Sequence, residues 1–424
     1  MPRCKDIPAT TKADWPALAA QSVSGFGATG FFLFVSSLMA LNALGIDSML
    51  PALPAIGEEF RVARINDRQW VIGIFMLGFG LAQIVWGPLI DRFGRKPLLI
   101  IGVVLFAVAN LLAGLANTFS MLLVTRLLGG VSASATRIIL ISVVRDCYSG
   151  RKMARIMSLA TMMIYFVPML APGVGLAITA LFGSWRAIFF ALAVYAVVVG
   201  TLGLVRLKET LRPELRRRLN VATVWIAFSW VLRDRPTFGY TLASAFSFAC
   251  VTGFIVSVEQ IFTGIFKVQD LFPILFAGIG CCMALATMLN AWLVESLGAR
   301  LISHGALIVF IAASAVHVAI AAAGCETLLA FLAIQGVQMF FYGLLSSNFS
   351  SIAMESVAEI AGSASSAQGF ISTSIGAIVG TIIGQSFDGT TVPLTLGFLG
   401  CGLISLCAVC FAEQGRLFGR VMRL

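Results

Sequence analysis

Residues Gly87–Pro97, GPLIDRFGRKP, join two long apolar stretches, residues 70 to 90 and 97 to 117. Three basic residues and one aspartate, Asp91, fall within these eleven positions. The two glycines of the segment permit close approach and unusual backbone dihedrals. A charged turn of this kind between two membrane-length segments predicts a hinge at the edge of a bilayer.

The composition is that of an integral membrane protein. Of 424 residues, 59% are hydrophobic and only 11% are charged, whereas about a quarter are charged in a soluble domain. The apolar runs are continuous, which predicts helices and not the short alternating strands of a barrel. We predict an all-α polytopic membrane protein with twelve transmembrane helices in two pseudo-symmetric six-helix bundles. The predicted spans are residues 27–50, 70–90, 97–117, 118–144, 156–181, 186–206, 237–259, 271–294, 301–324, 327–350, 360–386 and 391–412.

Basic residues are distributed unevenly over the predicted loops. Those on the side of both termini hold 22 Lys and Arg, and the opposite loops hold 5. Because positive charge is retained on the cytoplasmic side, we expect both termini in the cytoplasm and a multi-pass protein of the cell inner (plasma) membrane. The net charge of +10 then reflects topology, and no nucleic-acid partner is expected.

The longest polar interruption divides the spans six and six. We expect a cytoplasmic tail (1–26), an N-terminal six-helix bundle (27–206), a cytoplasmic linker (207–236), a C-terminal six-helix bundle (237–412) and a second cytoplasmic tail (413–424). Within the linker, apolar residues recur at helical spacing over a run too short to cross a bilayer. This pattern predicts an interfacial helix.

Two features indicate an internal duplication. The sequence AWLVESLGAR repeats the outline of the charged turn, with Glu295 in the position of Asp91, 204 residues later. Gly175 and Gly380 stand in a similar relation, 205 residues apart. Paired membrane halves are how many transporters build alternating access around a central site.

Residues suited to enzymatic or metal chemistry are scarce. The two histidines, His304 and His317, fall in one apolar span, and no HExxH, GxSxG or P-loop sequence occurs. Cys407 and Cys410 form a CxxC pair, but they lie in the last apolar span, where thiols usually act as small hydrophobes. We therefore expect no enzyme, no cofactor and no metal site.

Ionisable residues at bilayer depth are functional candidates because a charge there is costly unless it faces protein or water. Asp47 and Arg126 lie at matching depths in spans 1 and 4. If these spans are neighbours, the two residues form an acid whose protonation is set by a cation, as a proton-coupled transporter needs. The alternatives are that Asp47 caps a turn before Pro51 and that Arg126 belongs to a purely structural ion pair.

Arg137 follows Arg126 by eleven residues, about three helical turns, so both project from nearly one face of span 4. There Arg137 would meet an anionic substrate group or a partner such as Glu355, and a structural role is the alternative. Met and aromatic side chains would give adaptable cavity walls, although lipid contact or packing is the favoured explanation of them. The predicted cavity residues are Arg137, Met162, Tyr165 and Phe340.

The charged turn has a candidate partner at the end of span 4. Asp146 is placed to bind Arg92 or Arg95, and such a cluster would latch the cytoplasmic side in one conformation and release it in the other. Simple setting of topology by positive charge is the alternative. The predicted cytoplasmic gate consists of Gly87, Asp91, Arg92, Gly94, Arg95 and Asp146.

Prolines and glycines are predicted to interrupt span 5, at Pro168, Pro172, Gly173 and Gly175. Kinks and close helix crossings are expected there. For the glycines, packing alone is an alternative to a moving part.

With these motifs the chain resembles the major facilitator superfamily, specifically drug:proton antiporters of the Bcr/CflA type. GPLIDRFGRKP is similar to the family signature between spans 2 and 3, and DSMLPALPAI to the pattern near the end of span 1. RLLGGVSASATRIILISVVRD is similar to the span 4 motif that begins with an arginine, and SWRAIF to the start of span 6. The resemblance covers essentially all twelve spans.

The resemblance implies a monomer in the lipid bilayer that exports small amphipathic drugs in exchange for protons. These drugs would be phenicol- or bicyclomycin-like compounds or lipophilic cations. Asp47 would bind the proton, Arg126 would couple it, and the span 5 residues around APGVG would form the antiporter motif. A facilitator or importer for a metabolite such as a sugar, peptide or siderophore is the main alternative, and a transporter-like sensor is a third.

Overall fold

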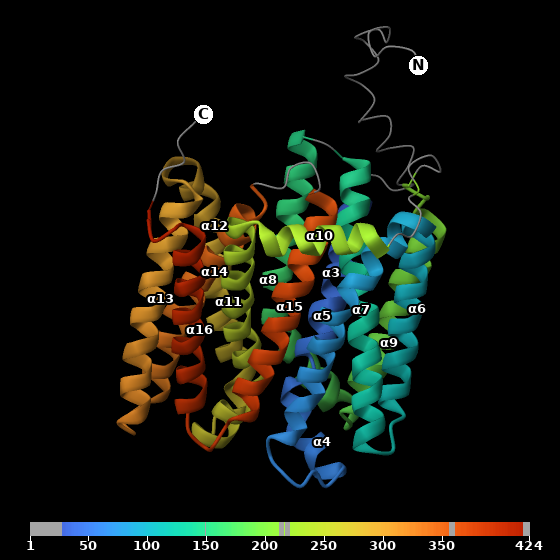
Figure 1. Ribbon diagram of the computed structural model, residues 1–424. Coiled ribbons are helices and arrows are strands. Elements are labelled where there is room, and N and C mark those ends of the chain that lie inside the picture. Colours follow the sequence, from blue (N-terminus) through green and yellow to red (C-terminus); the bar gives the residue numbers. More distant parts are fainter. Residues whose placement is uncertain (1–27, 149, 212–215, 217–220, 356–360, 419–424) are drawn as a thin grey trace, which may run out of the picture.

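The computed structural model of the protein describes residues 28–148, 150–211, 216, 221–355 and 361–418. Figure 1 shows a bundle of long helices that run roughly side by side, with the shorter helix α10 lying across one end. Twelve long helices occur in the described part of the chain, which contains no strand. The predicted all-α fold is therefore confirmed.

The long helices agree closely with the predicted spans. All their ends lie within three residues of the predicted ones, except that α8 begins six residues earlier. They are α3 (Ala28–Asp47), α5 (Trp70–Phe93), α6 (Arg95–Gly114), α7 (Phe119–Cys147), α8 (Gly150–Phe182), α9 (Arg186–Arg206), α11 (Arg235–Gln260), α12 (Phe272–Leu297), α13 (Ala299–Ala322), α14 (Leu328–Ala353), α15 (Ala361–Gln385) and α16 (Val392–Ala412).

The protein is a multi-pass membrane protein. Eleven of these helices are long and apolar enough to cross a bilayer within the described residues. Large apolar side chains such as Leu181, Val205 and Trp292 are more than two-thirds exposed on the outside of the bundle. Such a surface would be unfavourable in water and suits a lipid environment.

The two ends of the bundle are distinct. The short helix α4 (Leu53–Glu59) lies at one end, and α10 (Val221–Arg233) lies at the other, where α3 begins and α16 leads to Phe418 (Figure 1). We call these the α4 end and the α10 end.

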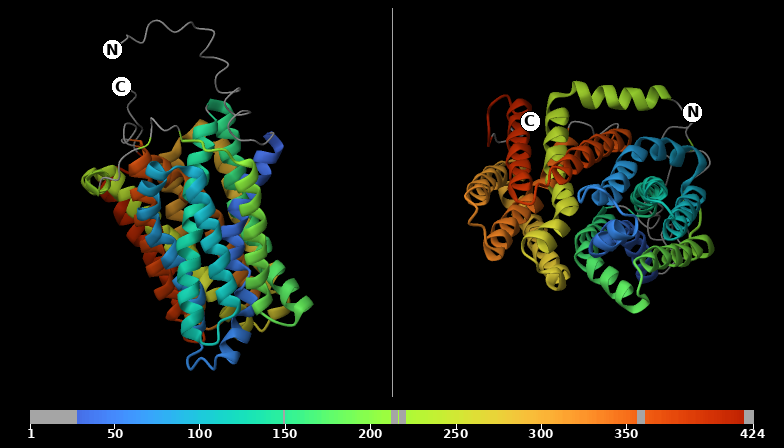
Figure 2. Two further views of the ribbon diagram at one scale, coloured as in Figure 1. Left: turned by 90° about the vertical axis from the view of Figure 1, so that its right-hand side faces the viewer. Right: turned by 90° about the horizontal axis from the view of Figure 1, so that it is seen from below.

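Packing divides the long helices into two groups of six. Helices α3 and α5 to α9 pack against one another, and α11 to α16 do the same. The extensive contacts between the groups are made by α5 with α15 and by α8 with α12, while α10 packs against α11 and α15. Seen along the bundle in Figure 2, the two groups lie side by side.

Local structure repeats between the groups. Gly94 and Gly298, with φ of 101° and 81°, end the second helix of each group, and the third helix follows directly. Glycine adopts such dihedrals at little cost. Thr118 and Thr327 begin the fourth helices, where each hydroxyl accepts a hydrogen bond from the backbone N–H three residues on.

The predicted interruption of span 5 is wrong. Helix α8 continues through Pro168 and Pro172, because neighbouring helices in a membrane protein can compensate for the backbone hydrogen bonds that proline removes. The chain breaks instead after Asp47, where α3 ends and the short helices η1 (Leu50–Ala52) and α4 follow.

Gly175 and Gly380 bring the fifth helix of each group against the first. A Cβ on Gly175 of α8 would collide with the carbonyl oxygen of Ser48, just past α3. A Cβ on Gly380 of α15 would lie 2.8 Å from both the carbonyl oxygen of Ala249 and the backbone nitrogen of Gly253 on α11. The two glycines therefore serve the same packing role, as an internal duplication would predict.

Gly380→Ala is expected to lower the thermal stability of the purified protein by several degrees. The added methyl group meets backbone atoms of α11 that cannot turn aside, and overpacking of this kind costs about 1–3 kcal/mol. Thermal unfolding in detergent measures the change. Gly278→Ala on α12 is the control, because a Cβ there meets nothing within 4 Å. Equal loss in both variants would contradict the close packing at Gly380.

Candidate functional site

Two ionisable side chains are buried together in the N-terminal group of helices. Asp47 is the last residue of α3, Arg126 lies on α7, and each is 2% exposed. Their opposite charges interact electrostatically, although no ion pair within 4.0 Å joins them in the described part of the chain. One oxygen of Asp47, Oδ1, and one nitrogen of Arg126, Nη2, have no hydrogen-bond partner among the described residues.

Arg126 is held in place by groups other than Asp47. Its Nε donates to the carbonyl oxygen of Val71 at 2.9 Å, and its guanidinium carbon lies 4.3 Å from the ring centroid of Phe75 and 5.8 Å from that of Phe189. These contacts offset part of the cost of burying the cation. Arg126 can therefore keep its position when the charge of Asp47 changes.

The carboxylate of Asp47 makes no hydrogen bond within the described part of the chain, so the capping alternative before Pro51 has no contact to support it. The absence of a fixed partner leaves the Asp47 carboxyl group available to exchange a proton or to meet a ligand.

Arg137 also faces α5 from α7. Its guanidinium carbon lies 5.6 Å from the ring centroid of Phe79, one turn along α5 from the ring that holds Arg126. The side chain is half-buried. Glu355, suggested above as its partner, pairs instead with Arg300 at 2.9 Å.

The predicted cavity residues are only partly placed. The side chains of Met162 and Tyr165 lie outside the described residues. Phe340 on α14 is half-buried, packs against Phe341 with ring centroids 5.5 Å apart, and lines an apolar depression of about 290 Å³. Arg137 is not among the residues of that depression, which lies on the other group of helices.

Arg95 is the centre of a charged cluster at the α10 end. The side chain of Arg95 is only 4% exposed, although Arg95 is the first residue of α6. Its Nε donates to Asp146 at 2.8 Å, and its Nη1 lies 3.3 Å from Asp91 and donates to the carbonyl oxygen of Ile90 at 3.0 Å. Thr210 donates to the same oxygen of Asp146 at 3.1 Å. Among the described residues, Arg95 and not Arg92 is therefore the arginine that pairs with Asp146.

Glu209, three residues past α9, completes this cluster and was missed from the sequence. Its carboxylate accepts hydrogen bonds from the backbone N–H groups of Arg95 and Lys96 at 2.9 and 3.2 Å. An acid at this position satisfies the first donors of α6 and complements the helix dipole. The same carboxylate fills the space beside Gly94, where a side chain would clash. Glu209 could not be recognised from the sequence, because a single acid in a loop after a span belongs to no motif that sets it apart.

Two of the predicted gate residues lie apart from the cluster. Arg92 is exposed, with its guanidinium carbon 5.1 Å from the ring centroid of Phe93. Gly87 faces the other group of helices, since a Cβ there would lie 3.4 Å from Oγ of Ser366 on α15. The charged cluster itself belongs wholly to the N-terminal group.

The C-terminal group carries a second charged cluster at the α10 end. Arg300, near the start of α13, pairs with Glu355 at 2.9 Å and with Glu413 at 2.8 Å. The hydroxyl of Tyr240 donates to Glu413 at 2.7 Å and lies 2.9 Å from Nε2 of His304. In both clusters a basic residue at the start of the third helix pairs with an acid at or just past the end of the fourth helix. An acid after the sixth helix also contacts this residue, through the backbone N–H of Arg95 in the first cluster and through the side chain of Arg300 in the second.

Asp91 and Glu295 hold the same position, three residues before the glycines that end α5 and α12, but their contacts differ. Glu295 is exposed and forms no ion pair in the described part of the chain. The acid that repeats is Glu413, 204 residues after Glu209. The described residues also contain no group of three His, Cys, Asp or Glu that could hold a metal ion.

Comparison with known proteins agrees with this architecture. The family model described as Major Facilitator Superfamily matches residues 33–381. The chain is 27% identical over 396 residues to a bicyclomycin resistance protein homolog of Haemophilus influenzae, covering 92% of this chain and 98% of that one. It is 31% identical over 182 residues to the multidrug resistance protein MdtL of Klebsiella pneumoniae, covering 43% and 46%.

Among solved structures, the fold is similar to a bacterial homologue of the human lysosomal transporter Spinster in an inward-facing, unoccupied conformation. The TM-score is 0.68 at 15% identity, covering 91% of this chain and 96% of that one. The family match spans most of the chain, and both the relatives and the fold are those of transporters and not of enzymes. The chain therefore belongs to the major facilitator superfamily, among transporters related to bicyclomycin and multidrug resistance proteins.

Proposed function

We propose that the protein exports small amphipathic drugs in exchange for protons. The observation that carries this proposal is the burial of Asp47 beside Arg126, with an oxygen of Asp47 left without a partner. A buried acid near a fixed cation can hold or release a proton according to what else occupies the site. Bicyclomycin-like compounds are the first candidate substrates, because a relative that matches almost the whole chain is named a bicyclomycin resistance protein homolog.

The α10 end is proposed to face the cytoplasm. The loops and tails on this side contain 22 of the 29 Lys and Arg residues, as the positive-inside rule requires of cytoplasmic loops. The protein would then lie in the inner membrane, as a monomer, with α4 on the outer face.

In the proposed cycle, drug and proton use one site in turn. Arg126 stays fixed on Val71 and Phe75. Drug binding from the cytoplasm would favour release of the proton from Asp47, and a proton arriving from the outside would favour release of the drug. The two groups of helices would rock about the α5–α15 and α8–α12 contacts, so that the site opens to one side at a time.

The charged cluster around Arg95 would stabilise one of these two states. It ties α5, α6, α7 and the segment after α9 together at the α10 end. These elements would then move as one unit, and the cluster acts as a structural brace of the cytoplasmic gate and not as a binding site.

Expression of the protein in a bacterial strain that lacks its own drug exporters is expected to raise the inhibitory concentration of at least one tested drug by about fourfold or more. The panel contains bicyclomycin, phenicols and lipophilic cations. Everted vesicles then measure direction, because drug addition should release protons from acidified vesicles under antiport. Proton uptake with a metabolite, and no response to any drug, would favour the importer alternative.

A further inference from the structure

Among the described residues, one ion pair joins the two groups of helices, and it lies at the α4 end. Arg68 lies in the short helix η2 (Asp67–Gln69) before α5, and its Nη2 donates to Oε2 of Glu259, near the end of α11, at 2.8 Å. The side chain of Glu259 is 1% exposed and that of Arg68 is 13% exposed. The other described ion pairs lie within one group.

Amide side chains extend this contact. Asn66 donates to the carbonyl oxygens of Gln385 and Phe387 at 2.9 and 2.7 Å, and Gln385 donates back to the carbonyl oxygen of Asn66 at 2.8 Å. Gln260 donates to Asn66 Oδ1 and to the carbonyl oxygen of Ile65, both at 3.1 Å. These bonds join the loop before α5 to the ends of α11 and α15, so the α4 end is closed.

Among the described residues, fewer polar contacts between the groups are found toward the α10 end than at the α4 end. Gln83 donates to Thr373 at 3.1 Å near the middle of α5 and α15. Beyond it, Gly87 faces Ser366, and no described ion pair joins the groups there. With the α4 end outside, the contacts described above close the outer face.

Glu259, like Asp47, is a buried acid near the end of the first helix of its group, although it lies 212 residues after Asp47 and so about two helical turns beyond the position that the 204-residue repeat gives. Asp47 is the last residue of α3 and Glu259 the last but one of α11, and these are the first helices of their groups. Each is buried and has one oxygen without a hydrogen-bond partner in the described part. A π-helical turn (Ile261–Ile265) follows Glu259, an irregularity that frequently marks functional sites.

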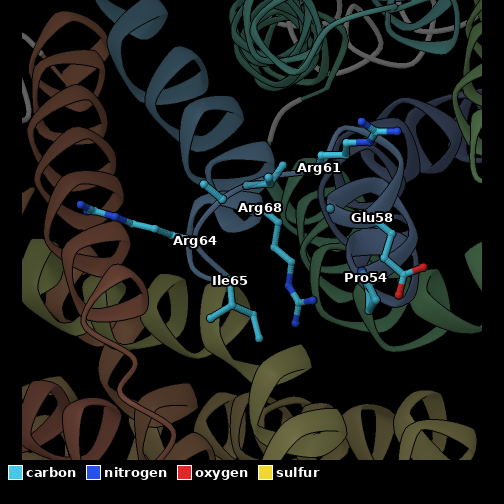
Figure 3. A pocket seen from close by; sticks show the side chains of 9 residues that line it. Pro54, Glu58, Arg61, Arg64, Ile65 and Arg68 are labelled. Carbon is cyan, nitrogen blue, oxygen red and sulfur yellow. The ribbon is translucent and has the colours of Figure 1, made fainter.

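The contact depends on the charge of Glu259. A buried carboxylate is stabilised by the guanidinium of Arg68, whereas a neutral carboxyl group gives up most of that attraction and leaves a poorly solvated cation. Figure 3 shows Arg68 extending away from Arg61 and Arg64, beside a depression of about 380 Å³ that all three line. Arg68 lines this depression and is 13% exposed, so a released Arg68 can reach water there.

The other charged groups near this end of α11 make no described ion pair or hydrogen bond with Glu259. Three of them have their own partners, since Glu326 binds His317 and Thr391, and Asp388 binds Thr390. The full set on the surrounding elements is Glu58, Arg61, Arg64, Asp67, Lys267, Asp270, His317, Glu326 and Asp388.

We propose that Arg68 and Glu259 form a proton-sensitive lock that holds the outer face closed, with Glu259 as a second proton-binding carboxyl group. Protons from the outside neutralise Glu259, the ion pair breaks, and the two groups of helices separate at the α4 end. The lock rests on the orientation and alternating access of the proposed function, but not on the identity of the drug or on the chemistry of Asp47.

Distance measurements on the full chain in lipid nanodiscs test the lock without a substrate. Bio-orthogonal spin labels at the exposed residues Ala63 and Ser386 report the separation of the two groups at the α4 end. The wild-type protein is expected to show one short distance at pH about 7.5 and a second, longer one at pH about 5, where a carboxyl group gains a proton more readily. Glu259→Gln is expected to raise the ratio of long to short distances at pH 7.5 by about tenfold, as loss of a buried ion pair permits.

Three further variants make the result specific. Arg68→Ala should open the α4 end as Glu259→Gln does, and it serves if that variant fails to fold. Arg64→Ala, which removes a neighbouring arginine that has no described partner, should behave as wild type. Asp47→Asn should keep the acid response. A wild-type protein that shows the acid response but no drug efflux would count against the proposed function alone. A wild-type acid response retained in Glu259→Gln, or no acid response in the wild type, would overturn the lock.

Discussion

Replacement of Asp47 by Asn is expected to reduce proton-coupled drug efflux by about 100-fold or more, because an amide cannot exchange a proton in the physiological pH range. The two side chains have nearly the same shape, and the described residues offer no hydrogen bond to Asp47 Oδ1 that the change would break. Loss of a buried carboxylate also removes a desolvation cost. The variant should therefore fold and reach the membrane, but it should not couple drug efflux to proton transport.

Everted vesicles measure this effect as the proton release that each drug evokes and as drug accumulation driven by an imposed pH gradient. Asp67→Asn is the matched control, because Asp67 is an acid of the same group of helices that forms no ion pair in the described part of the chain. If Asp47→Asn and Arg126→Ala both left the coupled efflux of every transported drug intact, the assignment of coupling to this pair would be wrong.

Two substitutions of Arg126 are expected to impair coupling to different extents. Its guanidinium stacks on Phe75 and donates to Val71, so Arg126→Lys retains the charge but loses the planar stacking. We expect the lysine variant to retain part of the coupling and the alanine variant to lose it. If Arg126 only formed a structural ion pair, the loss of efflux in each variant would be matched by a loss of thermal stability. Thermal unfolding measures that stability.

The sequence was sufficient for the fold because hydropathy alone determines which segments cross a bilayer. Every long helix was predicted, and the boundaries at Trp70, Arg186, Arg206 and Ala412 coincide with the predicted ones. The end of α5 and the start of α6, on either side of Gly94, lie three and two residues from theirs. The early start of α8 at Gly150 was missed because its first turns contain basic residues and do not read as a span. The continuity of α8 through Pro168 depends on its neighbours, which a single sequence does not show.

The candidate site was predictable where function requires a rare residue type. Asp47 and Arg126 stand out because charges are uncommon within spans. Glu209 and Glu259 do not stand out, since each lies near the end of a helix, where acids are ordinary. Their partners lie 114 and 191 residues away in the chain, and only the packing of the helices brings these groups together.

Arg95→Ala is expected to lower drug efflux by about tenfold and to reduce the stability of the protein by about 1–3 kcal/mol, the usual cost of leaving buried polar groups without partners. The change removes the cation that Asp91 and Asp146 share and leaves two carboxylates close together. It also frees the carbonyl oxygen of Ile90. The brace at the α10 end should loosen as a result.

Arg92→Ala is the matched control for this prediction, because Arg92 lies in the same turn but is exposed beside Phe93. Both variants remove one positive charge from the same loop, so any contribution of that charge to membrane topology is equal in the two. Efflux and thermal unfolding are compared after equal amounts of protein have been confirmed in the membrane. If the two variants lost activity to the same extent, the turn would act through its net charge, and the geometry around Arg95 would not matter. A loss confined to Arg95→Ala would assign the effect to the cluster. Partial recovery in Arg95→Lys would separate the charge of Arg95 from the directed hydrogen bonds of its guanidinium to Asp146 and to the carbonyl oxygen of Ile90.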